Sequence, residues 1–419
     1  MDKKVVMNAE QQLALDKIVK ERKNVFVSGA GGTGKSTVIQ AVKDNLDNVI
    51  VCAPTGMAAM NVGGETIHST FKLPCRVLGP NEAFDKMLTK EIRNAEAIII
   101  DEISMVRSDC FSSIIKIIKI AEELRKRKKQ IIVFGDFWQL PPVITTNDRN
   151  VISEAWERET LNGFCFETEE WKQCNFEYVE LQKNVRQEND YEYQHALDLL
   201  RVGSHECIDY FNTYSSKQPV RGVTLCGRKA RVDAINRKES AKISRPAKEY
   251  HAIIDGNFPQ NKKMTEDCLE LKEGMRVMTI CNDKDKQYRN GSLGTIEELY
   301  EDSVVVRIDG GYPTRIVPYT WVAGRPKYED GKITEVYEGS FTQLPLRVAY
   351  ASTIHKVQGM TLGCANIDPD VFETGMLYVA MGRCRSIKDI HLMEPISGDA
   401  IYSSNKVKEF YENLQNNRC

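Results

Sequence analysis

The sequence predicts an α/β fold with an open parallel sheet, a second α/β segment and a small β-rich insertion. Short apolar runs, typical of strands buried on both faces of a parallel sheet, alternate with helical patterns in the first part of the chain. The alternation resumes after residue 176, and residues 271–333 contain short strand patterns separated by turn signals. A chain of 419 residues is also too long for one core, so two or three domains are expected.

The first α/β segment, residues 1–176, contains four predicted strands. These short apolar runs are Val25–Ser28, Val49–Ala53, Ala97–Ile100 and Ile131–Phe134. Ser36–Leu46 is predicted to be the helix after the first strand, and Cys110–Lys128 carries apolar residues at helical spacing. Residues 71–90 interrupt this rhythm with prolines and a glycine, which predicts an insertion.

The second α/β segment is predicted to comprise residues 177–270 and 334–419. Its candidate strands are Glu177–Leu181, Val223–Cys226 and Leu346–Ala349. The insertion at 271–333 has strand patterns at Arg276–Ile280, Gly294–Leu299, Ser303–Ile308 and Arg315–Pro318. Asn290-Gly291 and Asp309-Gly310-Gly311 supply the turn signals, and the whole pattern predicts a small β-barrel.

Composition excludes several classes of protein. The chain has 57 Lys and Arg against 59 Asp and Glu, so any nucleic acid would bind through a local basic channel and not through bulk charge. No apolar run approaches the ~18 residues of a membrane span. The 12 cysteines form no C-x-x-C pair, so no zinc site is expected. Without an evident signal peptide, we expect an intracellular protein, nuclear or cytoplasmic, with reduced thiols.

The sharpest local motif follows the first predicted strand and precedes a helix, the context that identifies a phosphate-binding loop. It consists of Gly29, Ala30, Gly31, Gly32, Thr33, Gly34, Lys35, Ser36 and Thr37. Its glycines allow backbone N–H groups to point at phosphate oxygens, and the helix N-terminus adds partial positive charge. Lys35 is expected to bind the β- and γ-phosphates, and the Ser36 hydroxyl to bind Mg²⁺.

An acidic pair and a glutamine follow two later strands of the predicted sheet. Asp101 is expected to hold Mg²⁺, and Glu102 to orient and deprotonate an attacking water. Gln139 can contact the γ-phosphate from the next strand end. The neighbouring Trp138 is equally consistent with a core residue. These residues together predict a nucleotide hydrolase.

Two arginines at the ends of hydrophobic segments suggest how a second domain takes part. Arg186 and Arg383 would each be an ordinary surface residue if considered singly. As a pair facing a phosphate loop, they are predicted to act as arginine fingers on the γ-phosphate. The basic run Arg125–Lys129 is either a solvated helix end, which we favour, or a DNA-binding or import signal.

With these residues in place, the chain resembles the superfamily 1 DNA helicases of the 5′-to-3′ type, above all the Pif family and next the RecD-type enzymes. The resemblance extends from Asn8 to about Met393. It is carried by Asn8–Gln11, Ala53–Ala59, Gly64–Ser69, Asp101–Met105, Gly135–Pro142 and Thr353–Leu362. It implies two RecA-like P-loop domains with a Src-homology-three-like barrel in the second, Asn290–Gly294 as a matching barrel turn, and a strand-separating wedge at about 71–90.

The resemblance also implies roles for individual residues. Gln11 would contact the adenine of ATP, and Gln358 and Gly359 would lie near the nucleotide. The single-stranded DNA backbone would be contacted by Thr55, His68, Thr353 and His355. Hydroxyls, amides and imidazoles suit a protein that grips phosphates without reading bases.

The expected function is therefore an ATP- and Mg²⁺-dependent 5′-to-3′ DNA helicase acting in repair, recombination or replication. Its partners would be single-stranded DNA and forked duplex, and it would be a monomer in solution. Three alternatives stay open: a DNA-stimulated translocase that remodels complexes without unwinding, an RNA helicase of the same superfamily, and a small-molecule P-loop kinase. The kinase does not account for two candidate arginine fingers, and RNA-acting relatives usually carry a Cys/His-rich zinc module.

Overall fold

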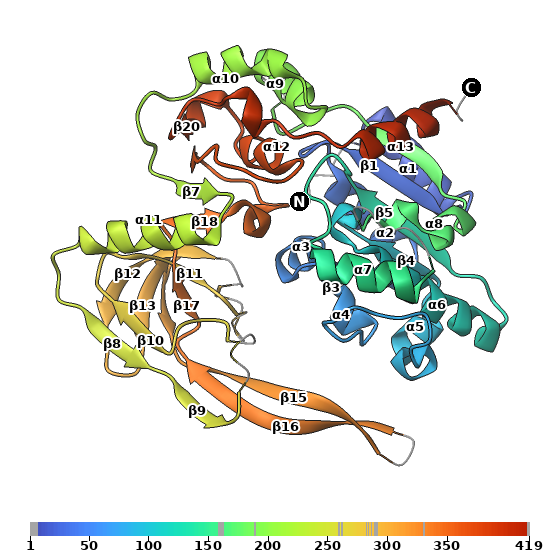
Figure 1. Ribbon diagram of the computed structural model, residues 1–419, viewed down its shortest axis with the longest axis horizontal. Coiled ribbons are helices and arrows are strands. Elements are labelled where there is room, and N and C mark those ends of the chain that lie inside the picture. The colour runs from blue at the N-terminus through green and yellow to red at the C-terminus, as the bar shows by residue number, and fades with distance from the viewer. Residues whose placement is uncertain are drawn as a thin grey trace. The chain divides into compact units, whose positions relative to one another are not determined.

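The computed structural model describes residues 7–416 except 158–162, 188–189, 259, 261–262, 282, 284, 286, 289–291 and 330–331. The chain forms two compact units (Figure 1). One unit comprises residues 1–227 and 353–419, and the other comprises residues 228–352. None of the described helices is both long and apolar enough to cross a membrane.

A six-stranded parallel sheet organises the first unit, in the order β3-β2-β4-β5-β1-β6. Its strands are β1 (Val25–Gly29), β2 (Val49–Ala53), β3 (Glu65–Thr66), β4 (Ala97–Ile100), β5 (Gln130–Gly135) and β6 (Glu177–Leu181). The four strands predicted in the first segment are confirmed. Glu177–Leu181 is a strand, but placing it in the second α/β segment is wrong, because it pairs with β1 from Val25↔Glu177 to Gly29↔Leu181. A short apolar run does not specify its partner strand.

Alternate residues of this sheet point into two different cores. Val25, Val27 and Ile99 pack with helices α1 (Ala9–Val19) and α2 (Lys35–Asn45) on one face. Phe26, Ile98 and Ile100 pack on the other face with α6 (Ser108–Arg125), α8 (Glu169–Gln173) and α13 (Asn405–Asn416). Period-two alternation in a strand buried on both faces makes every residue apolar, which is why these strands read as continuous apolar runs.

Shorter helices complete this part of the unit. They are α3 (Gly56–Asn61), α4 (Ile67–Thr70), α5 (Lys90–Asn94) and α7 (Thr146–Ala155). The helix predicted at Cys110–Lys128 is confirmed as α6, which ends when Lys126 adopts a left-handed conformation at φ 51°. Residues 71–90 are not a bare loop, because Phe71, Leu78 and Phe84 are buried in the core beneath α6.

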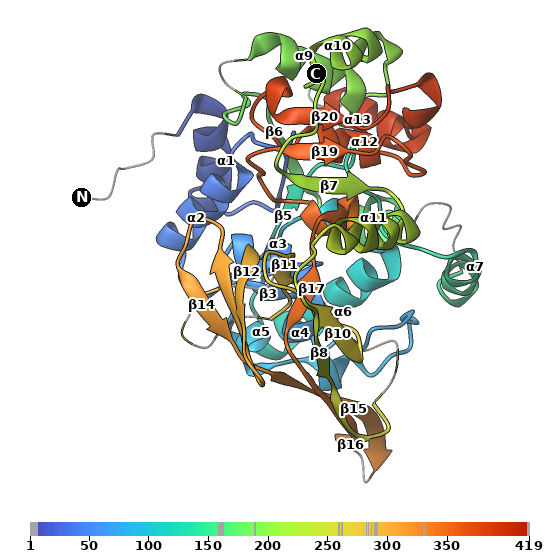
Figure 2. The same cartoon turned by 90° about the vertical axis from the view of Figure 1, so that its left-hand side faces the viewer.

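A second, smaller sheet has the order β18-β7-β19-β20, and its strands β7, β19 and β20 lie in the first unit (Figure 2). Its strands are β7 (Val223–Cys226), β18 (Ala351–Thr353), β19 (Ala365–Ile367) and β20 (Ile390–Leu392), and β7, β19 and β20 are parallel. A separate core joins them to helices α9 (Tyr191–Arg201), α10 (Ile208–Tyr214) and α12 (Met376–Met381). The predicted strand Val223–Cys226 is confirmed.

The second unit is built on a five-stranded antiparallel sheet in the order β14-β13-β12-β11-β17. Its strands are β11 (Arg276–Thr279), β12 (Leu293–Leu299), β13 (Val304–Ile308), β14 (Pro313–Ile316) and β17 (Leu346–Val348). Placing Leu346–Ala349 in the second parallel sheet is wrong, because β17 pairs antiparallel with β11 through Val277↔Val348. The Asp309–Gly311 turn joins β13 to β14, with Gly310 at φ 71°, whereas Asn290-Gly291 lies outside the described residues.

Further elements of the second unit are α11 (Lys229–Ala241), β8 (Lys248–His251), β9 (Ile253–Gly256), β10 (Cys268–Leu271), β15 (Tyr319–Glu329) and β16 (Lys332–Gln343). β15 and β16 form a long antiparallel hairpin joined at one edge by β9. The sequence analysis did not anticipate this hairpin. Its alternation contains Gly324 and Pro326, which weaken a strand pattern.

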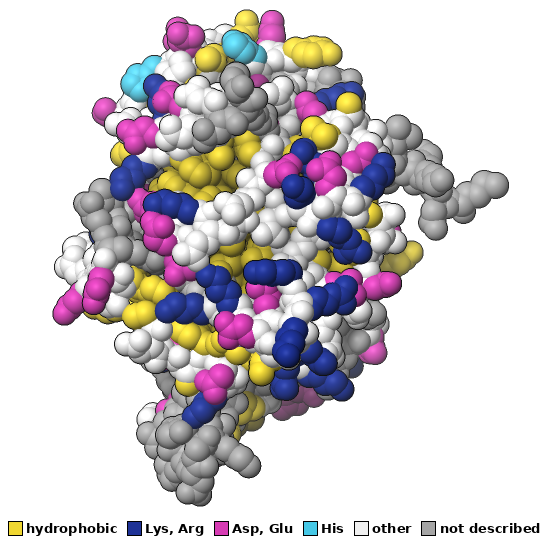
Figure 3. Space-filling model, turned by 90° about the vertical axis from the view of Figure 1, so that its right-hand side faces the viewer, with side chains coloured by type: hydrophobic (Ala, Val, Ile, Leu, Met, Phe, Trp, Pro, Cys, Tyr) yellow, Lys and Arg dark blue, Asp and Glu magenta, His cyan; other side chains and the backbone are white. Residues whose placement is uncertain are grey.

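Charges of both signs are mixed over the face of the protein that Figure 3 shows. The basic run at the end of α6 is a local example. Arg127 and Lys128 pair with Glu96 and Glu122 at 3.1 and 3.7 Å. Lys129 is buried, and its Nζ donates to the carbonyls of Arg93 and Ala95 at 3.0 and 2.6 Å. Arg127 and Lys128 are exposed, as the predicted solvated helix end requires, whereas Lys129 is buried and departs from that prediction.

The C-terminal helix α13 is part of the core of the six-stranded sheet. The Phe410 ring lies 4.2 Å from that of Phe166 and 5.3 Å from that of Phe137. We therefore expect Phe410→Ala to lower the free energy of unfolding of the first unit by about 3 kcal/mol. Urea unfolding followed by tryptophan fluorescence measures the change. Leu124→Ala, at an exposed position of α6, is the control and should shift the transition by less than about 0.5 kcal/mol; equal shifts would contradict the packing described.

Candidate nucleotide-binding site

The phosphate-binding loop runs from the end of β1 to the start of α2. Gly32 and Gly34 have φ angles of 92° and 85°, a region that side chains disfavour. A Cβ atom at Gly32 would lie 2.5 Å from Arg186 Cβ, and one at Gly34 would collide with Gln11 Nε2. Both glycines are therefore required by conformation and by close neighbours, as the motif predicts.

Lys35 begins α2 and holds the loop closed on itself. Its Nζ donates to the carbonyl oxygens of Gly29 and Ala30 at 2.6 and 3.0 Å. Burial lowers the pKa of Lys35, and the nearby carboxylates of Glu102, Asp136 and Asp101 oppose that shift. A desolvated ammonium bound only to carbonyls has a strong tendency to bind an anion.

Gln11 links helix α1 to this loop. Its Nε2 donates to the Thr33 carbonyl at 3.1 Å. Its Oε1 accepts from the Asn8 backbone N–H at 3.0 Å, in a capping box that begins α1. The buried Gln11 side chain thus joins the helix start to the residue before Gly34, at the position from which the resemblance expects contact with adenine.

Asp101 and Glu102 follow β4 and are both buried. Burial and the adjacent charge of Glu102 raise the pKa of Asp101 to about 7. Glu102 has φ 49° and ψ 46°, a left-handed conformation that is costly for a non-glycine residue and that clusters at functional sites. Its carboxylate accepts a hydrogen bond from Gln358 Nε2 at 3.1 Å.

Arg186 and Arg383 meet beside the phosphate loop. A Cβ atom at Gly31 would lie 3.2 Å from Arg383 Nη2 and 3.7 Å from Arg186 Nη1. Backbone carbonyls orient both guanidinium groups: Arg186 Nη1 donates to Gly382 at 2.8 Å, and Arg383 Nε donates to Val379 at 2.7 Å. Burial and the charge of Arg383 lower the pKa of Arg186 to about 10, and burial lowers that of Arg383.

A pocket of about 940 Å³ collects most of these groups. Of the predicted residues it is lined by Gly31, Gly32, Gly34, Lys35, Ser36, Asp101, Glu102, Gln139, Arg186, Gly359 and Arg383. Six predicted residues do not line the pocket: Gln11, Gly29, Ala30, Thr33, Thr37 and Gln358. Several of them form hydrogen bonds to the loop or to the lining residue Glu102 and so hold the pocket wall in place. A strand–glycine loop–helix with buried cations and two carboxylates defines a P-loop nucleotide-binding protein.

The donor set also fits a magnesium ion. Asp101 contributes a carboxylate and Ser36 a hydroxyl, both on the pocket wall and both oxygen donors of the kind that Mg²⁺ prefers. Burial and the charge of Glu102 raise the pKa of Asp101 while the charge of Lys35 opposes the shift, so a cation bound beside this carboxylate would stabilise its charged form. Asp101 and Ser36 are thus suited to hold the cation that accompanies a nucleotide.

The sequence analysis missed two residues that organise the site. Asn184 Nδ2 donates to the Gly31 carbonyl at 3.1 Å, and its Oδ1 accepts from the Arg186 backbone N–H at 2.8 Å. Asn61 Nδ2 donates to the Gly359 carbonyl at 3.3 Å. Asn184 lies two residues before Arg186. A polar side chain so close in sequence to a candidate arginine finger was the signal that could have identified Asn184 as a site residue.

The candidate DNA contacts lie at the ends of strands. β2 and β3 are parallel and pair Ala53 with Thr66, so Thr55 and His68 follow neighbouring strands at one edge of the sheet. Thr353 ends β18, and His355 lies in the short helix after it. Burial lowers the pKa of both His68 and His355, so each imidazole is neutral at pH 7. Trp138 is a core residue, buried and stacked on Tyr411 at 5.8 Å.

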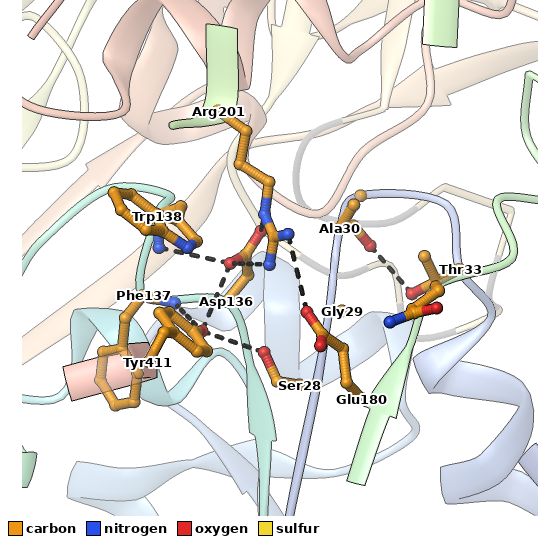
Figure 4. A network of polar contacts seen from close by, with 12 residues as sticks. Ser28, Gly29, Ala30, Thr33, Asp136, Phe137, Trp138, Glu180, Arg201 and Tyr411 are labelled. Carbon is orange, nitrogen blue, oxygen red and sulfur yellow. Dashed lines mark hydrogen bonds and ion pairs between the residues drawn. The ribbon is translucent and has the colours of Figure 1, made fainter. Parts of the chain in front are cut away.

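A buried ion pair, also missed, lies next to the loop (Figure 4). Asp136 directly follows β5, and its carboxylate accepts from Arg201 Nε at 3.1 Å and Nη2 at 3.0 Å. Arg201 also lies 3.8 Å from Glu180, and Tyr411 contacts both Asp136 and Ser28. Asp136 follows a strand of the large sheet, whereas Arg201 ends α9 of the smaller core. The pair therefore joins the two α/β cores of the first unit.

Comparison with known proteins identifies the family. The family model described as PIF1-like helicase matches residues 6–202. The chain is 30% identical to the ATP-dependent DNA helicase Pif1 of Bdellovibrio bacteriovorus, over 98% of this chain and 93% of that protein. It is 29% identical to the ATP-dependent DNA helicase PIF1 of Xenopus laevis, over all of this chain and 66% of that protein.

A solved structure supports the same assignment. The Pif1 helicase from Bacteroides, in complex with ADP-AlF3 and single-stranded DNA, is 31% identical and superposes with a TM-score of 0.84 over 98% of both chains. The chain belongs to the PIF1-like helicase family. The resemblance to the Pif family that the motifs predicted is confirmed.

Removing one finger should affect turnover much more than binding. Arg383→Ala is expected to lower kcat for ATP hydrolysis by about 10³-fold or more, because the guanidinium stabilises charge that develops only in the transition state. Steady-state ATP hydrolysis and binding of a fluorescent ATP analogue separate the two effects. Arg93→Ala, an exposed arginine at the end of α5, is the control and should leave both unchanged. A variant that lost affinity and kept kcat would contradict the role of Arg383.

Proposed function

We propose that the protein is an ATP-dependent DNA helicase that moves 5′-to-3′ on single-stranded DNA and unwinds duplex. The observation that carries the proposal is the meeting of Arg186 and Arg383 with the phosphate loop, within 3.7 Å of the Gly31 position. In this arrangement one α/β core supplies the loop and the acidic pair, and the other supplies Arg383. A nucleotide between them would be contacted from both sides.

The chemistry follows from the groups around the pocket. Glu102, held by Gln358, orients a water and takes its proton as the water oxygen attacks the γ-phosphorus. The bond from phosphorus to the β–γ bridging oxygen breaks, and ADP leaves. Lys35 and the two arginines stabilise the charge on the phosphoryl oxygens, and Gln139 contacts the γ-phosphate. Gln11 contacts the base from the start of α1.

Mg²⁺ is the cation that we propose for this site. When bound, it neutralises charge on the β- and γ-phosphate oxygens. Asp101 would hold it through its carboxylate and Ser36 through its hydroxyl, both of which line the pocket. The two adjacent buried carboxylates, Asp101 and Glu102, support this assignment, because a divalent cation would offset their charge.

We further propose that single-stranded DNA is gripped by Thr55, His68, Thr353 and His355. Thr55, His68 and His355 follow strands of the two sheets and Thr353 ends one, and loss of the γ-phosphate changes the contacts between the cores that carry them. Because both imidazoles are neutral at pH 7, they suit hydrogen bonds to the DNA backbone and not ion pairs. The lack of a single-sign surface on the face in Figure 3 agrees with a local channel.

Finer architectural assignments belong to the same proposal. The two parallel sheets would be the RecA-like domains, and the five-stranded antiparallel sheet would be the Src-homology-three-like insertion. Residues 71–90 would form the wedge. Two hydrogen bonds that anchor this segment to the first unit support the wedge assignment. The Leu78 N–H donates to the buried Asp109 at 2.8 Å, and Trp156 Nε1 donates to the Leu78 carbonyl at 2.8 Å. We also propose that the protein is a monomer in solution that acts in DNA repair, recombination or replication.

Replacing the proposed base tests the ATP half of the proposal. Glu102→Gln keeps the shape of the side chain but cannot accept a proton, so single-turnover hydrolysis should fall by about 10²–10⁴-fold. Binding of a non-hydrolysable ATP analogue should persist. Glu123→Gln, at an exposed carboxylate on α6 that does not line the pocket, is the matched control. Hydrolysis that survives in Glu102→Gln would overturn the assignment of the base.

The direction of translocation and the unwinding of duplex are tested with single-tailed duplexes. Duplexes with a 5′ tail only or a 3′ tail only are mixed with protein and ATP, and strand separation is followed by fluorescence. The proposal expects separation from the 5′ tail alone. DNA-stimulated hydrolysis without separation of either substrate would instead support a translocase that remodels complexes, and stimulation by RNA alone would support an RNA helicase.

The neutral histidines give a prediction about salt. His68→Ala and His355→Ala together should weaken binding to oligo-dT, because hydrogen bonds to the DNA backbone are lost. The slope of log Kd against log salt concentration should stay the same, since no counterion is released by a neutral group. Fluorescence anisotropy at several salt concentrations at pH 7.5 measures both quantities. A shallower slope in the double variant would show that the imidazoles bind as cations.

A further inference from the structure

Tyr378 connects the phosphate loop to the buried ion pair beside it. The residue lies on α12 and is buried. The Gly31 backbone N–H donates to its hydroxyl oxygen at 3.4 Å, and the hydroxyl lies 3.4 Å from Asp136 Oδ2. Asp136 in turn holds Arg201 through two hydrogen bonds. One side chain thus contacts both the loop and the carboxylate that joins the two cores.

The direction of these hydrogen bonds is fixed by the groups involved. A carboxylate paired with arginine only accepts, so the Tyr378 O–H donates to Asp136. The hydroxyl then has only lone pairs to offer to the loop, and Gly31 N–H is the donor. The result is a directed chain from Gly31 through Tyr378 to Asp136, which also accepts from Arg201.

Gly31 belongs to the loop whose N–H groups are expected to bind phosphate. A phosphate oxygen is charged and makes short bonds of about 2.9 Å, whereas the bond to the Tyr378 hydroxyl is long at 3.4 Å. Tyr378 and the triphosphate are therefore alternative acceptors for one N–H, and the phosphate is the stronger. Nucleotide binding would release Tyr378 from the loop.

Release of Tyr378 would affect the two arginine fingers, because helix α12, which contains Tyr378, positions both of them. The helix ends at Met381, and Arg383 follows two residues later with its Nε bound to the carbonyl of Val379 within α12. The Gly382 carbonyl orients Arg186. A shift of α12 on losing the Gly31 contact would move both fingers together. The contact is thus placed to link occupancy of the loop to the position of the fingers.

We infer that Tyr378 is a positioning residue whose hydroxyl occupies Gly31 N–H while the loop holds no triphosphate and releases it on nucleotide binding. The inference rests on the proposed function, because it assumes that the loop binds ATP. It adds to the proposed site a residue that acts on the loop and on the fingers without contacting a reacting atom. Its effect is a competition, so removing the hydroxyl should strengthen nucleotide binding and not weaken it.

The test compares two tyrosines that contact the same carboxylate. Tyr378→Phe removes the hydroxyl that faces Gly31, whereas Tyr411→Phe removes a hydroxyl 3.5 Å from Asp136 Oδ1 that does not contact Gly31. The full chain is titrated with a fluorescent, non-hydrolysable ATP analogue, with and without oligo-dT. Thermal unfolding of each variant checks that it is folded.

We expect Tyr378→Phe to bind the analogue about threefold to tenfold more tightly, the range of one weak hydrogen bond. The tightening of analogue binding by oligo-dT should shrink in the same variant, because one link between the loop and the fingers is gone. Tyr411→Phe should bind the analogue as wild type does. This split is one that a merely structural role would not produce.

Each other outcome has a definite meaning. Unchanged or weaker binding by folded Tyr378→Phe overturns the inference, as does an equal tightening by Tyr411→Phe, which would trace the effect to Asp136 in general. If wild type binds no analogue at all, the proposed function fails, and that result is distinct from failure of the inference. If Tyr378→Phe is unfolded, the ¹⁹F signal of 3-fluorotyrosine placed at position 378 of the otherwise wild-type chain, which keeps the hydroxyl, decides. A shift of this signal on addition of the analogue is expected, and an unchanged signal at saturating analogue overturns the inference.

Discussion

The buried pair of Asp136 and Arg201 is the interaction on which the arrangement of the first unit depends. Two charged groups out of water are costly, and a hydrophobic pair of the same volume would give equal or greater stability. The pair is fully satisfied, with two hydrogen bonds from the guanidinium and contacts from Tyr378 and Tyr411. Because one partner comes from each α/β core, the pair favours a single register between the cores. That register brings Arg383 to the phosphate loop.

The residues that bind phosphate could be predicted from the sequence because they are local. Gly29 to Thr37 lie between a strand and a helix that their own pattern specifies, and Asp101, Glu102 and Gln139 follow the next strands of a parallel sheet. In such a sheet the carboxyl ends of the strands share an edge, so strand ends imply proximity. Arg186 and Arg383 could be proposed only as a pair, and the structure brings them together.

What the sequence did not reveal depends on long-range partners. The run Glu177–Leu181 reads as a strand, but nothing in its alternation says that it pairs with β1, and Leu346–Val348 likewise joins an antiparallel sheet. The contact of Tyr411 with Ser28 spans nearly the whole chain. Tyr378 acts through a backbone group of the loop, which leaves no mark on residue spacing, whereas Asn184 was marked only by its place two residues before Arg186. Burial of Trp138 was undecided for the same reason, since its partner Tyr411 is distant in sequence.

The central claim is that hydrolysis at this pocket is coupled to single-stranded DNA through the contacts between the two cores. The most direct test is the rate of ATP hydrolysis by the wild-type chain, with Mg²⁺ present, as oligo-dT is titrated in. The account predicts a saturable increase of about tenfold or more, in the usual range of coupling between two sites. Hydrolysis at the same rate at every DNA concentration would contradict this coupling, because the pocket would then hydrolyse ATP independently of single-stranded DNA.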